Sequence, residues 1–281
     1  TRYRAGYGAL KMDSLPKRLI SLTLVAALVA ACSTTRTGRS QLTLKSDAAL
    51  AQEGTRQMAI IRENSPLVQD RATIDYVACV ADAIVGTLEG EDAALYWELA
   101  IVNQPDVNAF VMPGGKIVVK SGILTVAQNQ HQLAAVLGHE VAHVTAHHAN
   151  ERATRGDLTS YGVEVLALIL GGGYYNQTQG AYGAASTLNT MGLMNPFSRM
   201  QESEADEIGL RYMAMAGFDP RESVELWQNM NSSEQTAKVP EFMSTHPSGE
   251  TRIESMVEML PEMLVLYNEA KAQGRNPDCQ R

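Results

Sequence analysis

The stretch Leu137-Gly138-His139-Glu140-Val141-Ala142-His143 decides the fold, because its two histidines are four residues apart. In a helix, residues i and i+4 lie on one face, one turn apart. Both imidazoles can then reach one zinc ion at about 2.0–2.1 Å. Glu140 follows the first histidine directly and can reach a water on that metal. The pattern therefore predicts a zinc site on a helix, which we expect to span residues 130–152.

A third protein ligand must come from elsewhere in the chain. One type of zinc site continues the helix motif with a Gly three residues and a His six residues after the second histidine, but Ala146 and Ala149 occupy these positions. Another type takes a glutamate from a second helix. Glu202-Ser203-Glu204-Ala205-Asp206 lies 59 residues beyond His143 and offers Glu and Asp one turn apart. We expect Glu202 to bind the metal, with Glu204 as the competing candidate, and Asp206 to accept a hydrogen bond from a ligand histidine.

These residues predict peptide-bond hydrolysis. Zinc lowers the pKa of its bound water toward neutrality and polarises the scissile carbonyl. Glu140 is then the general base that takes the proton of the zinc-bound water and later delivers it to the leaving amine. One Zn²⁺ per chain suffices for this chemistry.

The remaining pattern predicts an α+β fold that is mostly helical, with a small mixed sheet. Two helices are expected between residues 47 and 89, separated at Ser65-Pro66, and a helix is expected to begin at Ser121. Pro113-Gly114-Gly115 predicts a turn between two strands. The expected strands span residues 96–102, 107–112 and 116–120. Further helices are expected at 199–216, 220–230 and 251–271. Residues 171–195 are rich in Gly, Tyr, Gln and Asn and are expected to form a mobile loop.

The first residues predict export. We expect translation to start at Met12, and Lys17 and Arg18 precede an apolar run from Leu19 to Ala31. Val29-Ala30-Ala31-Cys32 resembles a bacterial lipobox, in which the cysteine is lipidated and becomes the first mature residue. The alternative is an ordinary signal or anchor helix with a chance cysteine. We therefore divide the chain into upstream residues and signal peptide (1–31), lipidated Cys32 and flexible tether (32–46), and metallopeptidase domain (47–281).

Cysteine and charge content agree with an extracytoplasmic protein. Apart from Cys32 the chain has Cys79 and Cys279, and an even pair in an oxidising compartment predicts a disulfide, with two free thiols as the alternative. Residues 1–31 hold five basic side chains and one acidic, which leaves 18 basic and 30 acidic in residues 32–281 and a formal charge of −12. Nucleic acid is therefore not expected as a partner, since phosphate binding requires basic patches.

Taken together, the motifs resemble the gluzincin family that contains the CAAX prenyl proteases and the bacterial heat-shock membrane protease, and most of all its periplasmic lipoprotein branch. The matching pieces run in order over roughly residues 47–270. They are Asn108-Ala109-Phe110, Pro113-Gly114-Gly115, residues 137–143, Arg199 with residues 202–206, and Thr245-His246-Pro247-Ser248.

The resemblance implies further roles. A strand that includes Asn108, Ala109 and Phe110 would bind the substrate backbone by strand addition, although Asn108 could equally cap a turn. His246 would stabilise the oxyanion or act as a fourth, inhibitory ligand, the alternative being a surface-loop histidine. The family pattern assigns no ligand role to His147 or His148, so both are expected to be structural or solvated.

The expected function is that of a zinc endopeptidase that cleaves misfolded or unassembled cell-envelope proteins. It would act at the periplasmic face of the bacterial outer membrane, held there by lipid on Cys32. The integral-membrane branches of the family carry several membrane-spanning helices, which residues 32–281 lack, so prenylated substrates are not expected. The main alternative is a chaperone-like binder with a latent metal site, and a weaker one is an envelope amidase.

Overall fold

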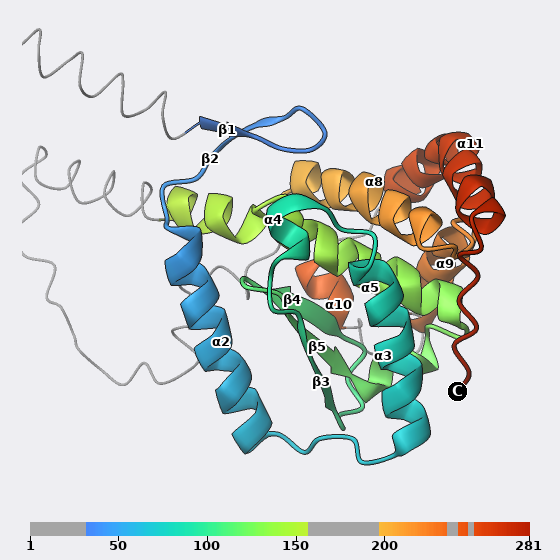
Figure 1. The fold of residues 1–281 in the computed structure, drawn as a ribbon, viewed down its shortest axis with the longest axis horizontal. Coiled ribbons are helices and arrows are strands. Elements are labelled where there is room, and N and C mark those ends of the chain that lie inside the picture. Colours follow the sequence, from blue (N-terminus) through green and yellow to red (C-terminus); the bar gives the residue numbers. More distant parts are fainter. Residues whose placement is uncertain (1–31, 157–196, 235–240, 247–249) are drawn as a thin grey trace, which may run out of the picture.

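A computed structural model describes residues 32–156, 197–234, 241–246 and 250–281 (Figure 1). The expected signal peptide and the predicted loop 171–195 lie outside these residues. The α+β prediction is confirmed, because helices predominate and pack around a small mixed sheet. None of the helices in the described part is long and apolar enough to cross a membrane.

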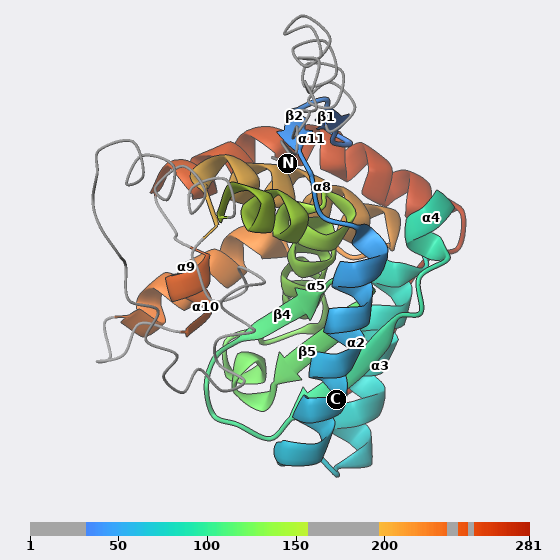
Figure 2. The ribbon, with the colours of Figure 1, turned by 90° about the vertical axis from the view of Figure 1, so that its left-hand side faces the viewer.

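The sheet contains β3 (Glu98–Val102), β4 (Ala109–Met112) and β5 (Lys116–Lys120), in the order β3-β5-β4. β5 is parallel to β3 and antiparallel to β4. The turn between β4 and β5 needs glycine, since Gly114 and Gly115 have φ angles of 81° and 74°. Because β5 lies between β3 and β4, β4 is an edge strand of this sheet. Figure 2 shows it on the side that faces helix α5.

Helices cover both faces of the sheet. α2 (Asp47–Asn64) lies along one face and α3 (Arg71–Val85) along the other (Figure 1). Alternate strand residues point to opposite faces, so Ala100, Val102 and Val118 pack with Met58 of α2. Their neighbours in the strands join the larger core with α3 and α5. Ser46 and Asp70 cap the N-termini of α2 and α3, which are separated at Ser65-Pro66 as predicted.

The motif helix is shorter than predicted. α5 runs from Gln130 to Thr145, and the chain turns at residues 146–147 before it is helical again over 148–156. His147 has a φ of 55°, in the left-handed region, which a continuous right-handed helix cannot contain. The prediction of one helix over residues 130–152 is therefore wrong at this break. Residues 121–125 also differ, forming the 3-10 helix η1 (Ser121–Thr125) after an extended Lys120.

α8 (Arg199–Met215) crosses α5 and has the most extensive contact with it among the described helices. Two glycines allow this approach: a Cβ atom on Gly138 would lie 2.8 Å from the carbonyl oxygen of Gly209. α9 (Glu222–Glu234), α10 (Glu241–Thr245) and α11 (Glu250–Ala272) complete this helical layer. The short helix α4 (Gly90–Ala93) follows α3.

The N-terminal residues depart from the predicted flexible tether. β1 (Cys32–Thr34) and β2 (Ser40–Leu42) form an antiparallel hairpin, at the top of the views in Figures 1 and 2. Arg39 between them makes ion pairs with Glu151 (2.9 Å) and Glu204 (2.6 Å). These ion pairs attach the hairpin at residues 32–42 to the helices, in contrast to the flexible tether expected there.

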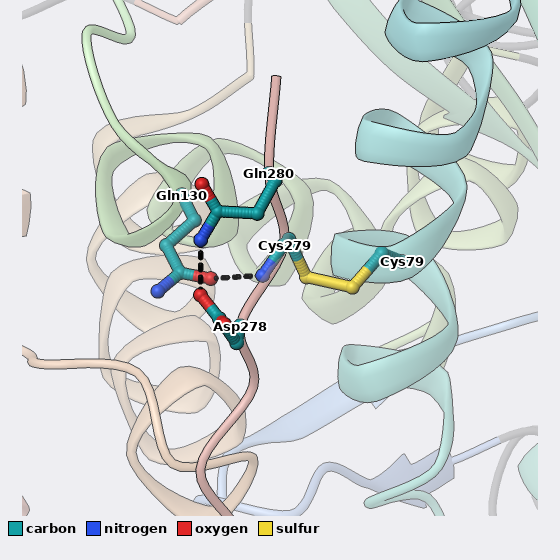
Figure 3. The surroundings of a disulfide bond; sticks show 5 residues. All are labelled: Cys79, Gln130, Asp278, Cys279 and Gln280. Carbon is teal, nitrogen blue, oxygen red and sulfur yellow. Dashed lines mark hydrogen bonds between the residues drawn. A yellow bond between two sulfur atoms is a disulfide. The ribbon is translucent and has the colours of Figure 1, made fainter.

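A disulfide joins Cys79 of α3 to Cys279 of the C-terminal tail, as the cysteine count predicts. Figure 3 shows the tail passing the start of α5, where the backbone N–H of Cys279 donates a hydrogen bond to Oε1 of Gln130 (2.8 Å). The bond closes a separation of 200 residues. It therefore ties the end of the chain to the helices beside the sheet.

Candidate metal centre

The two motif histidines converge from one face of α5. The Nε2 atoms of His139 and His143 lie 3.0 Å apart, and both side chains are buried. Without a metal, at most one of these two Nε2 atoms can donate a hydrogen bond to the other when both rings are neutral. Their approach is the arrangement expected around a shared cation.

Glu202 reaches the same point from the first turn of α8. Its Oε2 lies 3.5 Å from Nε2 of His139, and its Oε1 lies 3.5 Å from Nε2 of His143. α8 begins at a Ser198–Gln201 capping box, which fixes the first turn that carries Glu202. Glu204, the competing candidate, lies outside the group.

His246 completes the cluster from the residue after α10. Its Nδ1 lies 3.1 Å from Nε2 of His139 and 3.0 Å from Oε1 of Glu202. The ring stacks on Phe242, with ring centroids 4.5 Å apart, and on Phe197, with centroids 5.2 Å apart. Among the described residues, the ligand atoms of His139, His143, Glu202 and His246 lie within 4.8 Å of one another. His246 is therefore a buried member of the site rather than a surface-loop residue.

This donor set fits zinc. Two imidazoles and one carboxylate are the protein ligands of a well-known type of catalytic zinc site, with a fourth position left open. Every ligand atom is buried with the others, and a single cation between them would balance the carboxylate charge. The four residues can thus hold one metal ion, for which zinc is typical.

The protonation states reflect burial and the nearby charges. Burial lowers the pKa of His139, but hydrogen bonds to Asp206 and Glu202 outweigh it and raise this pKa to about 9. Burial dominates at His143 and holds its pKa well below the usual range. Burial would raise the pKa of Glu202, but the surrounding histidines outweigh it and lower that pKa strongly.

Glu140 lies beside the cluster as the sequence predicts for a base. Burial raises its pKa above the usual carboxyl value. Its Oε1 makes no hydrogen bond, although Nε2 of His246 is 3.2 Å away. A carboxylate with a raised pKa and a free oxygen is suited to take up and return a proton.

Asp206 orients His139 from one turn further along α8. Its Oδ1 lies 2.9 Å from Nδ1 of His139. Arg252 of α11 donates two hydrogen bonds to Asp206, at 2.5 and 2.7 Å, and its guanidinium lies 3.9 Å from the ring centroid of Trp227. Sequence reasoning missed Arg252, because no spacing relates it to the motif helix.

His143 has a different outer partner, His148. The Nδ1 atoms of the two rings lie 2.7 Å apart, and Nε2 of His148 lies 3.1 Å from Oε2 of Glu204. His148 is completely buried, whereas the side chain of His147 is 45% exposed and pairs with Asp47. Of the two roles expected for this pair, His148 thus has the structural one and His147 the solvated one.

The predicted substrate-binding strand borders the site. Asn108 and Phe110 line a cavity of about 230 Å³ that also reaches Glu140 and His246. Oδ1 of Asn108 is buried without a hydrogen-bond partner, so a donor from a bound peptide could satisfy it. Ala109 is buried in the core and pairs with Val119, so it could contact a substrate only through its backbone.

Comparison with known proteins agrees with this site. The model of peptidase family M48 matches residues 74–260. Mitochondrial metalloendopeptidase OMA1 of Schizosaccharomyces pombe is 38% identical over 207 residues, which cover 73% of this chain and 56% of that protein. The enzyme of the same name from Saccharomyces cerevisiae is 38% identical over 181 residues, 62% of this chain and 50% of that protein.

A bacterial relative is also similar. The beta-barrel assembly-enhancing protease of Yersinia pestis is 29% identical over 219 residues, 75% of this chain and 43% of that protein. The chain thus spans about half the length of these curated relatives. The family match covers most of the chain and includes the motif helix, Glu202 and His246, and the chain therefore belongs to peptidase family M48.

Proposed function

We propose that this protein is a zinc-dependent endopeptidase that cleaves misfolded or unassembled proteins of the cell envelope. The observation that carries the catalytic part is the convergence of His139, His143 and Glu202 beside the free Oε1 of Glu140. Zinc held by these residues would supply a Lewis acid and lower the pKa of a water molecule. The protein chain itself would position the substrate and transfer the proton.

The substrate would add as a strand to the edge of β4 that pairs with no other strand in the described part of the chain. Exposed backbone N–H and C=O groups of an edge strand pair readily with an extended peptide. β4 leads from the cavity at Asn108 and Phe110 to a second cavity of about 580 Å³ that Val111, Pro113 and His143 help to line. A peptide along β4 would therefore pass the metal ligands between two spaces for its side chains.

Glu140 would move the proton. Its raised pKa favours proton uptake, and its Oε1 points to the site without a competing hydrogen bond. After cleavage the same carboxyl group would return the proton to the leaving amine.

The envelope part of the proposal has separate support. The lipobox-like Val29-Ala30-Ala31-Cys32 and the even cysteine pair suggest export and lipid attachment. The name of the Yersinia pestis relative refers to β-barrel assembly, which agrees with envelope substrates, whereas the OMA1 relatives are mitochondrial. We therefore propose that the chain belongs to the periplasmic lipoprotein branch and carries lipid on Cys32 at the outer membrane.

Cleavage of an unfolded protein in zinc buffer tests the catalytic part. Glu140→Gln is expected to retain zinc and lower the rate by about 10²–10⁴-fold, the usual contribution of a general base. The exposed Glu63 of α2 provides a control, because Glu63→Gln changes the same group far from the site. Wild-type proteolysis by Glu140→Gln would exclude the mechanism. If the wild type and Glu140→Gln both suppress aggregation of the substrate without cleaving it, the chaperone-like alternative is correct.

Mass spectrometry of the N-terminal peptide tests the anchor. Growth in a bacterium with lipoprotein processing is expected to give lipidated Cys32 in the outer-membrane fraction. Cys32→Ser is expected to remove the lipid mass and release the protein from that fraction. An unmodified Cys32 in the membrane-bound protein would contradict this assignment.

A further inference from the structure

The two imidazole ligands on α5 are oriented by different partners. His139 meets the carboxylate of Asp206 directly, whereas Nδ1 of His143 lies 2.7 Å from Nδ1 of His148. Nε2 of His143 is the nitrogen that faces His139 and Glu202. Metal binding requires a lone pair on this Nε2, so the ring proton of His143 must be on Nδ1.

A proton on Nδ1 of His143 determines which tautomer His148 adopts. Only one of the two facing Nδ1 atoms can donate, and His143 must be the donor. His148 must then accept through Nδ1 and carry its own proton on Nε2. That N–H points to Oε2 of Glu204, 3.1 Å away, which gives a continuous chain of donors from His143 to the carboxylate.

The N-terminal hairpin holds Glu204 in its acceptor role. Nε of Arg39 donates to Oε2 of Glu204 (2.6 Å), and the hydroxyl of Thr37 donates to Oε1. Arg39 also donates twice to Glu151, at 2.9 Å each, which fixes its guanidinium. The Glu204 carboxylate is therefore surrounded by donors that belong to the hairpin and to His148.

We propose that Arg39 and Glu204 are positioning residues that select the metal-binding tautomer of His143 through His148. Without the Glu204 acceptor, no hydrogen bond to that carboxylate stabilises the His148 tautomer with its proton on Nε2. A proton on Nδ1 of His148 would force His143 to accept there and to carry its own proton on Nε2, where the metal must bind. The hairpin at residues 32–42 thus contributes to metal affinity although it contributes no ligand.

Zinc affinity of matched variants tests the proposal. Glu204→Leu removes the acceptor with little change in size, and Glu63→Leu makes the same substitution at an exposed position of α2, outside this network. Loss of an outer partner of a metal ligand typically weakens affinity by about 10–100-fold. We expect this loss for Glu204→Leu in competition with a chelator, and wild-type affinity for Glu63→Leu. Wild-type affinity of Glu204→Leu, or an equal loss in both variants, would overturn the proposal.

A second measurement uses the unaltered protein. Nitrogen-15 NMR of the zinc-loaded wild type distinguishes the two tautomers of each histidine ring. We expect His148 to carry its proton on Nε2, and protonation on Nδ1 would overturn the proposal even if a variant fails to fold. The inference rests on the metal-binding part of the proposed function. Chelator competition reports metal binding, and NMR reports ring protonation. A protein that binds zinc but shows no proteolysis would therefore give the same two results.

Discussion

Gly138 of α5 and Gly209 of α8 face each other where the two helices cross. A Cβ atom on Gly209 would lie 2.7 Å from the backbone nitrogen of His139, and one on Gly138 would lie 2.8 Å from the carbonyl oxygen of Gly209. Side chains at either position would separate the helices. Since α8 carries Glu202 and α5 carries both histidines, this contact sets the distance between the ligands.

The first prediction follows from this contact. Gly209→Ala should destabilise the protein by about 1–3 kcal/mol, the usual cost of overpacking, and should weaken zinc binding. Gly156→Ala is the control, because a Cβ at that helical position meets none of the described residues within 4 Å. Urea unfolding and chelator competition would measure both effects. Unchanged zinc affinity in Gly209→Ala would show that the ligand distances tolerate a wider crossing.

The second prediction concerns His246, the fourth potential ligand in the cluster. Nδ1 of His246 lies 3.1 Å from Nε2 of His139, on the side of the cluster that faces Glu140. We expect His246→Ala to retain zinc through the three other ligands and to cleave unfolded substrate faster than wild type. If His246 instead stabilises the oxyanion, the rate should fall by about 10²–10³-fold. Rate and bound zinc, measured on the same samples, distinguish the two roles.

The third prediction concerns the disulfide. Replacing Cys79 and Cys279 by serine should lower the free energy of unfolding by about 2–5 kcal/mol, as for other native disulfides. Urea unfolding with and without reductant provides the measurement. Reductant should destabilise the wild type and leave the double variant unchanged. A wild type that is insensitive to reductant would contradict the pairing in solution.

The fourth prediction concerns acid stability. Burial would raise the pKa of Glu151, but hydrogen bonds from Arg39 and Gln201 outweigh it and lower the pKa below the usual carboxyl value of 4.5. A lowered pKa in the folded state gives stability that is fully present above pH 4.5 and is lost as pH falls through the folded pKa. Glu151→Gln lacks this ionisation.

The stability of wild type and Glu151→Gln is best compared in metal-free protein, because acid would otherwise release the metal during the titration. We expect wild type to exceed Glu151→Gln in stability by about 1–3 kcal/mol at pH 7, since a buried charged hydrogen-bond partner is lost. The difference should narrow below pH 4.5. A difference that is constant over this range would show that Glu151 does not titrate with a lowered pKa.

Much of the site was predictable because it depends on spacing within single helices. His139 and His143 share a face of α5, and Glu202 and Asp206 share a face of α8, as a period of 3.6 residues requires. The turn at Gly114 and Gly115 was predictable for a similar local reason, since both need a positive φ. The disulfide followed from the cysteine count once Cys32 was set aside.

His148 was not predictable in this way. Five residues after His143 on a continuous helix it would point about 140° away, given about 100° per residue. The left-handed turn at His147 ends the helix and brings His148 back onto His143. Neither helical periodicity nor the family pattern indicated that turn, so the residue was expected to be structural or solvated.

The sequence by itself determined the ligand types, the base and the cysteine pair, because these depend on residue identity and on spacing along one helix. Only the tertiary structure decided that Arg252 holds Asp206 and that Arg39 of an ordered hairpin reaches Glu204. These contacts join segments far apart in the chain. Their geometry depends on how closely α5 and α8 pack at Gly138 and Gly209, and no local pattern specifies that distance.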